Sequence, residues 1–199
     1  SNPRLLRSGQ FVFRWRNLMP LPALACILSL QHGGASISEE IVPGLRLSAS
    51  VLFLAGLSVR LWIVGSVPVG SSDRSTRTMK TPSLNTSGAY SVVRNPLYVA
   101  NLLLWLGIAV VAGFPLGVLA ALINFGVGYS LVVLAEESHL RRSFGAVYER
   151  WCRNTPRWRP HWSAYRPSAD PYSLRRAVQR EVPLWLLIAG LWLLIEWGR

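Results

Sequence analysis

Apolar residues in this chain gather into long blocks instead of recurring at the spacing of a one-sided helix. The block at 45–67 is long enough to cross a bilayer and carries Arg60 inside it. Blocks at 96–111 and 114–135 follow one another closely, with only a short break around Gly113 between them. The pattern predicts membrane-spanning helices, two of which form a tight hairpin.

Two further blocks are shorter. Residues 182–197 carry Trp185, Trp192 and Trp197 near their ends, where aromatic side chains anchor a span at the interface. Residues 18–30 contain two prolines, so this segment either extends back through residues 11–15 or lies partly in the interface. We expect five spans, with four as the alternative.

The composition agrees with a membrane protein. Hydrophobic residues make up 51% of the 199 residues and charged residues only 15%, and the mean hydropathy is +0.30. A soluble domain carries about 25% charged residues. We predict an all-α polytopic membrane protein of one domain. Its N-terminal spans occupy 18–83, a functional core occupies 84–160, and a basic segment with the final span occupies 161–199.

The basic residues are distributed unevenly. Of the 21 Lys and Arg residues, 18 lie in three segments, 1–17, 70–95 and 136–181. With five spans, all three segments fall on one side of the membrane, whereas the loops on the other side carry Glu39 and Glu40 or no charge. The positive-inside rule makes the basic side cytoplasmic. The net charge of +12 flanks apolar spans, which favours anionic lipid headgroups over nucleic acid as the partner.

An amphipathic pattern follows the fourth span. Apolar side chains recur there at helical spacing: Leu140, Phe144, Val147, Tyr148 and Trp151. This predicts a C-terminal interfacial helix lying on the membrane. Pro156 and Pro160 then bracket an extended turn, whose Arg and Trp residues we interpret mainly as membrane anchors.

Candidate chemistry lies at the two ends of the predicted hairpin. A polar, turn-rich entry to the block at 96–111 holds Arg94 and two phenols, Tyr90 and Tyr98, and the next charges are Glu136 and Glu137. The hairpin brings both ends to the same membrane face, so we expect a small site of one cation, two phenols and two carboxylates. The structural alternative is a salt bridge between charges at span ends. The three histidines lack metal-ligand spacing, so no metal site is predicted.

These residues resemble a known family. The chain reads Gly88-x-Tyr90-x3-Arg94-Asn95-Pro96-x-Tyr98, then two spans, then Glu136-Glu137-x2-Leu140-x3-Phe144-Gly145-x2-Tyr148. This order is similar to the isoprenylcysteine carboxyl methyltransferase and phospholipid methyltransferase family over roughly residues 84–160. The resemblance implies an integral membrane enzyme that binds S-adenosylmethionine on the cytoplasmic side.

The resemblance also implies roles for single residues. Arg94, Tyr98 and the pair Glu136 and Glu137 stand where the family has its motif residues. Asn95 stands where the family usually has His, and an amide cannot change its charge near neutral pH. Cofactor binding can survive that change, whereas proton transfer at this position cannot. Residues 129–134 contain no basic residue, so roles that some relatives give to an Arg before the acidic pair do not carry over.

The cofactor's chemistry suits these residues. A guanidinium such as that of Arg94 can bind its carboxylate through two parallel hydrogen bonds, and Glu136 or Glu137 can hold its ammonium. Adjacent helical residues point about 100° apart, so the two carboxylates cannot face one atom. Glu137 lies three residues before Leu140 and seven before Phe144, so it shares their helix face, which we take as the packed side. This favours Glu137 over Glu136 as the functional carboxylate. We therefore expect Arg94 and Glu137 to be the catalytic residues. The cofactor-binding set is Tyr90, Arg94, Asn95, Tyr98, Glu136, Glu137 and Tyr148.

Three functions stay open at this point. The first is methyl transfer to a lipid or other hydrophobic acceptor, which could be a carboxylate, phosphate, amine or thiol. The second is an NADPH-dependent membrane reductase of the sterol-reductase type, for which the chain looks short. The third is a non-catalytic lipid-binding protein, for which Asn95 is the only hint. The sequence indicates neither the acceptor nor the oligomeric state.

Overall fold

The computed structural model describes residues 21–32, 38–67, 83–168 and 170–197, and within these ranges the regular structure is helical. The helices are α2 (Leu21–His32), α3 (Val42–Ser66), α4 (Ala89–Val92), α5 (Pro96–Ala112), α6 (Pro115–Asn154) and α7 (Leu174–Trp197), with single 3-10 turns η2 (Glu39–Ile41) and η3 (Trp162–Ala164). An isolated bridge joins Gly88 to Arg166, and no strand occurs among the described residues.

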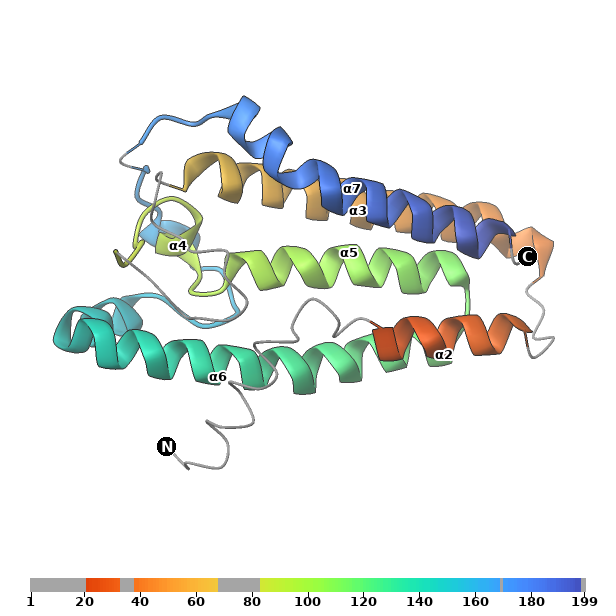
Figure 1. Ribbon diagram of the computed structural model, residues 1–199, viewed down its shortest axis with the longest axis horizontal. Helices are drawn as coiled ribbons and strands as arrows, with labels where there is room; N and C mark the ends of the chain where they lie inside the picture. Colours follow the sequence, from red (N-terminus) through yellow and green to blue (C-terminus); the bar gives the residue numbers. More distant parts are fainter. Residues whose placement is uncertain (1–20, 33–37, 68–82, 169, 198–199) are drawn as a thin grey trace.

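The long helices lie side by side in one bundle (Figure 1). Segments 83–95 and 155–173 lie together at one end, which we call the basic end. The connection through η2, the α5–α6 turn and the end of α7 lie at the opposite end. This separation is the one that the charge pattern predicts. The side of the membrane that each end faces stays a prediction.

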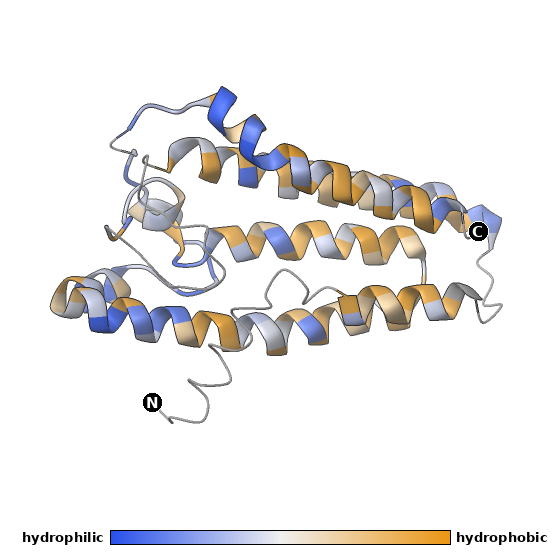
Figure 2. Ribbon diagram, in the orientation of Figure 1, coloured by the Kyte–Doolittle hydropathy of each residue, from blue (hydrophilic) through white to orange (hydrophobic). Residues whose placement is uncertain are grey.

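Three helical segments are long and apolar enough to cross a membrane: Glu39–Ser66, Pro115–Asn154 and Leu174–Trp197. Two shorter apolar helices, Leu21–Leu30 and Pro96–Ala112, complete the bundle. Figure 2 shows apolar residues along the middle of the bundle and hydrophilic residues gathered at the basic end. The expected all-α membrane fold is confirmed, and the choice between five and four spans stays a prediction.

The hairpin of α5 and α6 forms where the sequence predicts it. Gly113 ends α5 in the left-handed conformation with φ 83°, which a residue without a side chain adopts without strain. Phe114 caps the next helix and Pro115 opens it, a position where the missing N–H costs nothing. Small residues let α3 approach α5 closely. A Cβ at Gly56 would lie 2.8 Å from Leu104 Cδ2.

Two helices extend beyond their predicted bounds. α6 continues past the acidic pair to Phe144, and a further helical segment then runs to Asn154 across a kink. That this last segment lies on the membrane surface stays a prediction. The non-helical residue at the kink is Gly145, with φ 49° and ψ −124°. α7 begins at Leu174, eight residues before the predicted start, and continues through Pro183. The first residues of the predicted block at 18–30, its alternative extension through 11–15 and the basic segment at 1–17 lie outside the described residues.

Candidate functional site

The hairpin places Arg94 beside the acidic pair at the basic end. Arg94 precedes α5, and its backbone N–H donates to the carbonyl of Pro156 at 2.9 Å. The carboxylate of Glu137, on α6, lies 3.0 Å from Arg94 Nη1. Glu137 is only 4% exposed, so this ion pair is shielded from water. The expected meeting of these two residues is therefore observed, in the form of the salt bridge that was the structural alternative.

A second guanidinium completes the cluster around Glu137. Arg157 donates from Nε to Glu137 Oε1 at 2.9 Å and from Nη2 to Oε2 at 2.6 Å. The Glu137 carboxylate raises the pKa of the Arg157 guanidinium, chiefly through these hydrogen bonds. Sequence reasoning treated Arg157 as a membrane anchor and missed this contact. Its place between two prolines was the available signal, because such a segment folds back only with tertiary support.

Glu136 has a separate environment. The hydroxyl of Tyr98 donates to Glu136 Oε1 at 2.8 Å, and the ring of Tyr98 packs against that of Tyr129 with centroids 4.9 Å apart. Glu136 is half-buried, whereas Glu137 is buried. The two carboxylates thus face different partners, as the helix geometry requires.

Buried donors near Glu137 lack hydrogen-bond partners among the described residues. Arg94 Nη1 donates to the thiol of Cys152 at 3.3 Å, but the Nε of Arg94 makes no hydrogen bond. Tyr148 is fully buried, and its hydroxyl has no hydrogen-bond partner either. Burial, and then the Glu137 carboxylate, raise the pKa of Tyr148 above its usual range, so its hydroxyl keeps its proton. Unpaired buried donors are rare in proteins, and two of the four found among the described residues lie beside this carboxylate. The other two, the Nε of Arg176 and the Nε1 of Trp185, lie on α7.

Asn95 and Tyr90 hold the polypeptide around this cluster. The Asn95 side chain donates from Nδ2 to the carbonyl of Arg157 at 3.2 Å, and Asn95 also caps α5. The carbonyl of Tyr90 accepts a hydrogen bond from Trp151 Nε1 at 3.1 Å. Burial, with a contribution from Glu136, raises the pKa of Tyr90 to about 12. In this structure, the polar contacts of Asn95 and of the Tyr90 backbone therefore hold loops in place.

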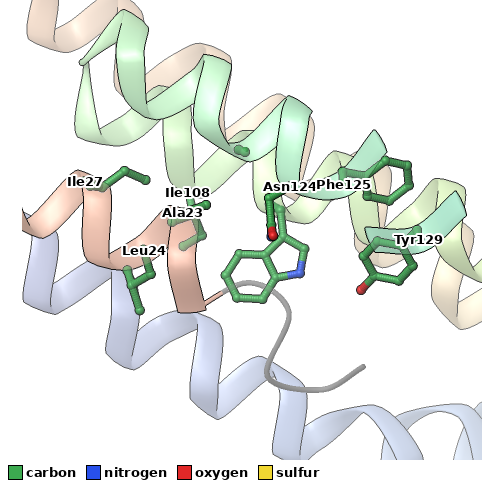
Figure 3. Close-up of a pocket in the computed structure, with 9 residues that line it drawn as sticks. Ala23, Leu24, Ile27, Ile108, Asn124, Phe125 and Tyr129 are labelled. Carbon is green, nitrogen blue, oxygen red and sulfur yellow. The ribbon is translucent and has the colours of Figure 1, made fainter. Parts of the chain in front are cut away.

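An apolar groove reaches toward the cluster from inside the bundle. It lies between α2, α5 and α6 (Figure 3) and holds about 360 Å³ of empty space, including the part open to the outside. Its lining consists of Ala23, Leu24, Ile27, Trp105, Ile108, Ala121, Asn124, Phe125 and Tyr129. The ring centroids of Phe125 and Trp158 lie 6.1 Å apart, and Trp158 directly follows Arg157 in the chain. The groove therefore ends at the aromatic side chains that border Glu136 and Glu137.

A second ion pair lies within the bundle. Arg60 on α3 donates to both carboxylate oxygens of Glu181 on α7, at 2.5 and 3.0 Å, and its Nη1 hydrogen-bonds the side chain of Asn101 on α5. Glu181 is 1% exposed. The Nδ2 of Asn101 in turn donates to the hydroxyl of Tyr129 at 3.4 Å. The sequence analysis noted Arg60 but gave it no partner, because α7 was expected to begin after Glu181.

Comparison with known proteins identifies the core of the chain. The family model described as phospholipid methyltransferase matches residues 45–147. The match includes most of α3 and most of α6, so it reaches further toward the N-terminus than the motif resemblance and stops before Tyr148. Arg157 and α7 lie outside it.

One relative is the cobalt-zinc-cadmium resistance protein CzcN of Cupriavidus metallidurans, which is 34% identical over 118 residues. The aligned part is 59% of this chain and 54% of that protein, so the chain matches about half of the relative's length. No solved structure matches the chain.

Proposed function

Because the chain belongs to the phospholipid methyltransferase family, we propose that it transfers a methyl group from S-adenosylmethionine to a lipid or another hydrophobic acceptor. One observation carries the proposal. A buried carboxylate, Glu137, lies between Arg94 and Arg157 at the end of an apolar hairpin, with unpaired donors beside it. The same cluster lies at the basic end, which we propose to be cytoplasmic and in contact with anionic headgroups.

The residues present fit the cofactor's amino-acid end. S-adenosylmethionine carries a carboxylate, which needs hydrogen-bond donors, and an ammonium, which needs a carboxylate. The Nε of Arg94 and the hydroxyl of Tyr148 are two buried donors next to Glu137 that have no hydrogen-bond partner among the described residues. Glu137 is the buried carboxylate next to them. We assign the cofactor's carboxylate to Arg94 and Tyr148, and its ammonium to Glu137.

The cofactor supplies a methyl group on a sulfonium centre. When bound, it would give this methyl group to a nucleophile on the acceptor, with the electron pair of the carbon–sulfur bond left on sulfur. The protein's part is to hold the two reactants in line and to exclude water, and such positioning can account for several kcal/mol of a barrier. The aromatic rings of Tyr98, Tyr129 and Trp158 form a dry border for this purpose.

The apolar groove suits the acceptor's hydrocarbon part. Its lining is aliphatic and aromatic apart from the amide of Asn124 and the hydroxyl of Tyr129. An acceptor seated there would have its polar end near Tyr98 and Glu136. Asn95 cannot take up a proton, and an anionic carboxylate, phosphate or thiolate needs no base. The geometry therefore favours these acceptors over a protonated amine, unless Glu136 accepts the proton.

Titration of the purified protein in detergent tests the proposal. We expect S-adenosylmethionine to bind with micromolar to sub-millimolar affinity in isothermal titration calorimetry, and NADPH not to bind. Incubation with methyl-labelled cofactor and fractionated membrane lipids would then place the label in one lipid class. Binding of NADPH without S-adenosylmethionine would support a reductase instead. Cofactor binding without methyl transfer to any lipid, thiol or peptide fraction would support a non-catalytic protein.

A further inference from the structure

The hydrogen bonds to Glu137 are divided unequally between its two arginines. Arg157 supplies two of the contacts, one to each carboxylate oxygen, at 2.9 and 2.6 Å. Arg94 supplies one contact, at 3.0 Å to Oε1. This bidentate geometry is the stronger arrangement for a guanidinium on a carboxylate. In the structure, Arg157 therefore covers the oxygens that an ammonium group on a ligand would need.

The two arginines also differ in their freedom to move. The Arg94 side chain is 16% exposed and is additionally held by Cys152, whereas that of Arg157 is 39% exposed. The backbone around Arg157 is fixed to the start of the α5 region. The Asn95 side chain binds the Arg157 carbonyl, and the N–H of His161 donates to the carbonyl of Val92 at 3.0 Å. The side chain of Arg157 can thus turn toward water while its backbone stays in place.

We propose that Arg157 occupies the ammonium position of the cofactor site and leaves Glu137 when the cofactor's amino-acid end binds. This inference rests on the function proposed above. It follows from charge balance, since Arg94, Arg157 and Glu137 together carry one net positive charge. Adding an ammonium without moving Arg157 would put a third cation on a single buried carboxylate. With Arg157 in water, Arg94 and Glu137 match the ligand's carboxylate and ammonium charge for charge.

Arg157 then sets the affinity and the selectivity of the site. A ligand gains access to Glu137 only if it carries a cation that replaces the guanidinium. The competing arrangement keeps Arg157 on Glu137 and uses it as a further donor to the ligand's carboxylate. The two arrangements predict opposite effects for removal of the side chain.

The first test compares Arg157→Ala with Arg159→Ala by calorimetric titration of S-adenosylhomocysteine. Arg159 is an exposed neighbour on the same segment, so its variant controls for the loss of one positive charge. We expect Arg157→Ala to bind about five to ten times more tightly than the unmodified protein, because no partner has to be displaced. Methylthioadenosine, which lacks both the ammonium and the carboxylate, should bind all three proteins equally.

Unchanged or weaker binding of S-adenosylhomocysteine by Arg157→Ala would overturn the inference while leaving the proposed function intact. Absence of binding by every variant, the unmodified protein included, would overturn both.

The second test uses the unmodified protein and does not depend on how the variant folds. Phenylglyoxal modifies accessible guanidinium groups, and mass spectrometry of the peptides reports each site. We expect the reactivity of Arg157 to rise when S-adenosylhomocysteine is added, whereas that of Arg159 stays constant. Protection of Arg157 by the ligand, or no change, would contradict its displacement.

Discussion

Two carboxylates are buried in the part of the chain that the structure describes, and their surroundings differ. Glu181 meets one arginine, Arg60, and the two side chains are 2% and 13% exposed. The side chain of Glu137 is 6% exposed but meets two arginines, of which the Arg157 side chain is 39% exposed. Both carboxylates are buried near the basic end of the bundle.

The two carboxylates differ in whether all buried donors of the arginines beside them have hydrogen-bond partners. Arg60 donates to both oxygens of Glu181 and to Asn101, so that network is closed. Around Glu137, the Nε of Arg94 and the hydroxyl of Tyr148 are left without hydrogen-bond partners among the described residues. A buried charge in a membrane protein can be a clamp between helices or part of a binding site. We propose that the second role belongs to Glu137, because a donor of its own arginine, Arg94, is left unpaired, whereas Arg60 has no unpaired buried donor among the residues described.

The largest expected effect is a loss of stability at the ion pair of Arg60 with Glu181, which we call the closed pair. Glu181→Gln leaves the Arg60 charge buried without a counter-charge, and breaking a buried pair in this way costs about 3–5 kcal/mol. We expect a lowered melting temperature in detergent, measured by intrinsic fluorescence and by size-exclusion chromatography.

Glu196→Gln is the matched control. Glu196 pairs with Arg46, whose side chain is 55% exposed, so its loss should change stability far less than the loss of Glu181. The double variant Arg60→Met with Glu181→Leu should recover most of the lost stability. Equal melting of Glu181→Gln and Glu196→Gln would show that the buried pair is no clamp.

We call Arg94, Glu137 and Arg157 the open cluster. Substitutions there are expected to lower stability less than those in the closed pair, and to weaken cofactor binding more. On the assignment proposed above, Glu137→Gln and Arg94→Ala would each remove a charge-assisted contact with the cofactor, worth about 1.5–3 kcal/mol, or one to two decades in affinity. Stability should fall less than in Glu181→Gln, because the exposed Arg157 can turn to water. Glu136→Gln should weaken binding less. Near-native turnover of Glu137→Gln at saturating cofactor would show that the site is misassigned.

Tyr148→Phe tests whether a buried hydroxyl without a partner serves ligand binding or the stability of the fold. The hydroxyl makes no hydrogen bond to the described residues, so its removal should leave the melting temperature unchanged or slightly raised. Cofactor affinity should fall roughly three- to ten-fold if the hydroxyl binds the ligand's carboxylate. A loss of stability with no change in affinity would mean that the hydroxyl serves the fold.

The smallest effect concerns Tyr90, which lies within the electrostatic reach of both regions. Glu136 raises its pKa and Arg60 lowers it, while burial brings it to about 12. Because the folded pKa exceeds the unfolded value near 10, this group's contribution to stability is full below pH 10 and is lost between about pH 10 and 12. Difference absorbance of the protein and Tyr90→Phe checks the titration, and Glu136→Gln should shift it to lower pH.

Much of the fold follows from local sequence. The apolar blocks predicted α3, the α5–α6 hairpin and the later part of α7, because span length and the Gly113 break are local signals. The early start of α7 was missed because charged residues from Arg175 to Glu181 resemble a loop. Contacts with residues far away in sequence hold them in place: Glu181 pairs with Arg60, and Arg176 Nη2 donates to the carbonyl of Gly65 at 2.8 Å.

The candidate site, too, could be predicted from the sequence only in part. The spacing of Arg94, Glu136 and Glu137 around a hairpin predicted their proximity, and the ion pair of Arg94 with Glu137 agrees with it. Arg157 escaped prediction because its contact requires the chain to fold back after Asn154, which depends on hydrogen bonds to Arg94 and Asn95. The roles of these residues toward a cofactor stay predictions.

Photolabelling with an azido-adenine analogue of S-adenosylmethionine tests most directly that the open cluster, not the closed pair, is the binding site. Peptides would be mapped by mass spectrometry, with excess S-adenosylhomocysteine as competitor. The account predicts competed label within residues 88–98 or 136–158. Competed label confined to the peptides around Arg60 and Glu181, with none at the basic end, would contradict it.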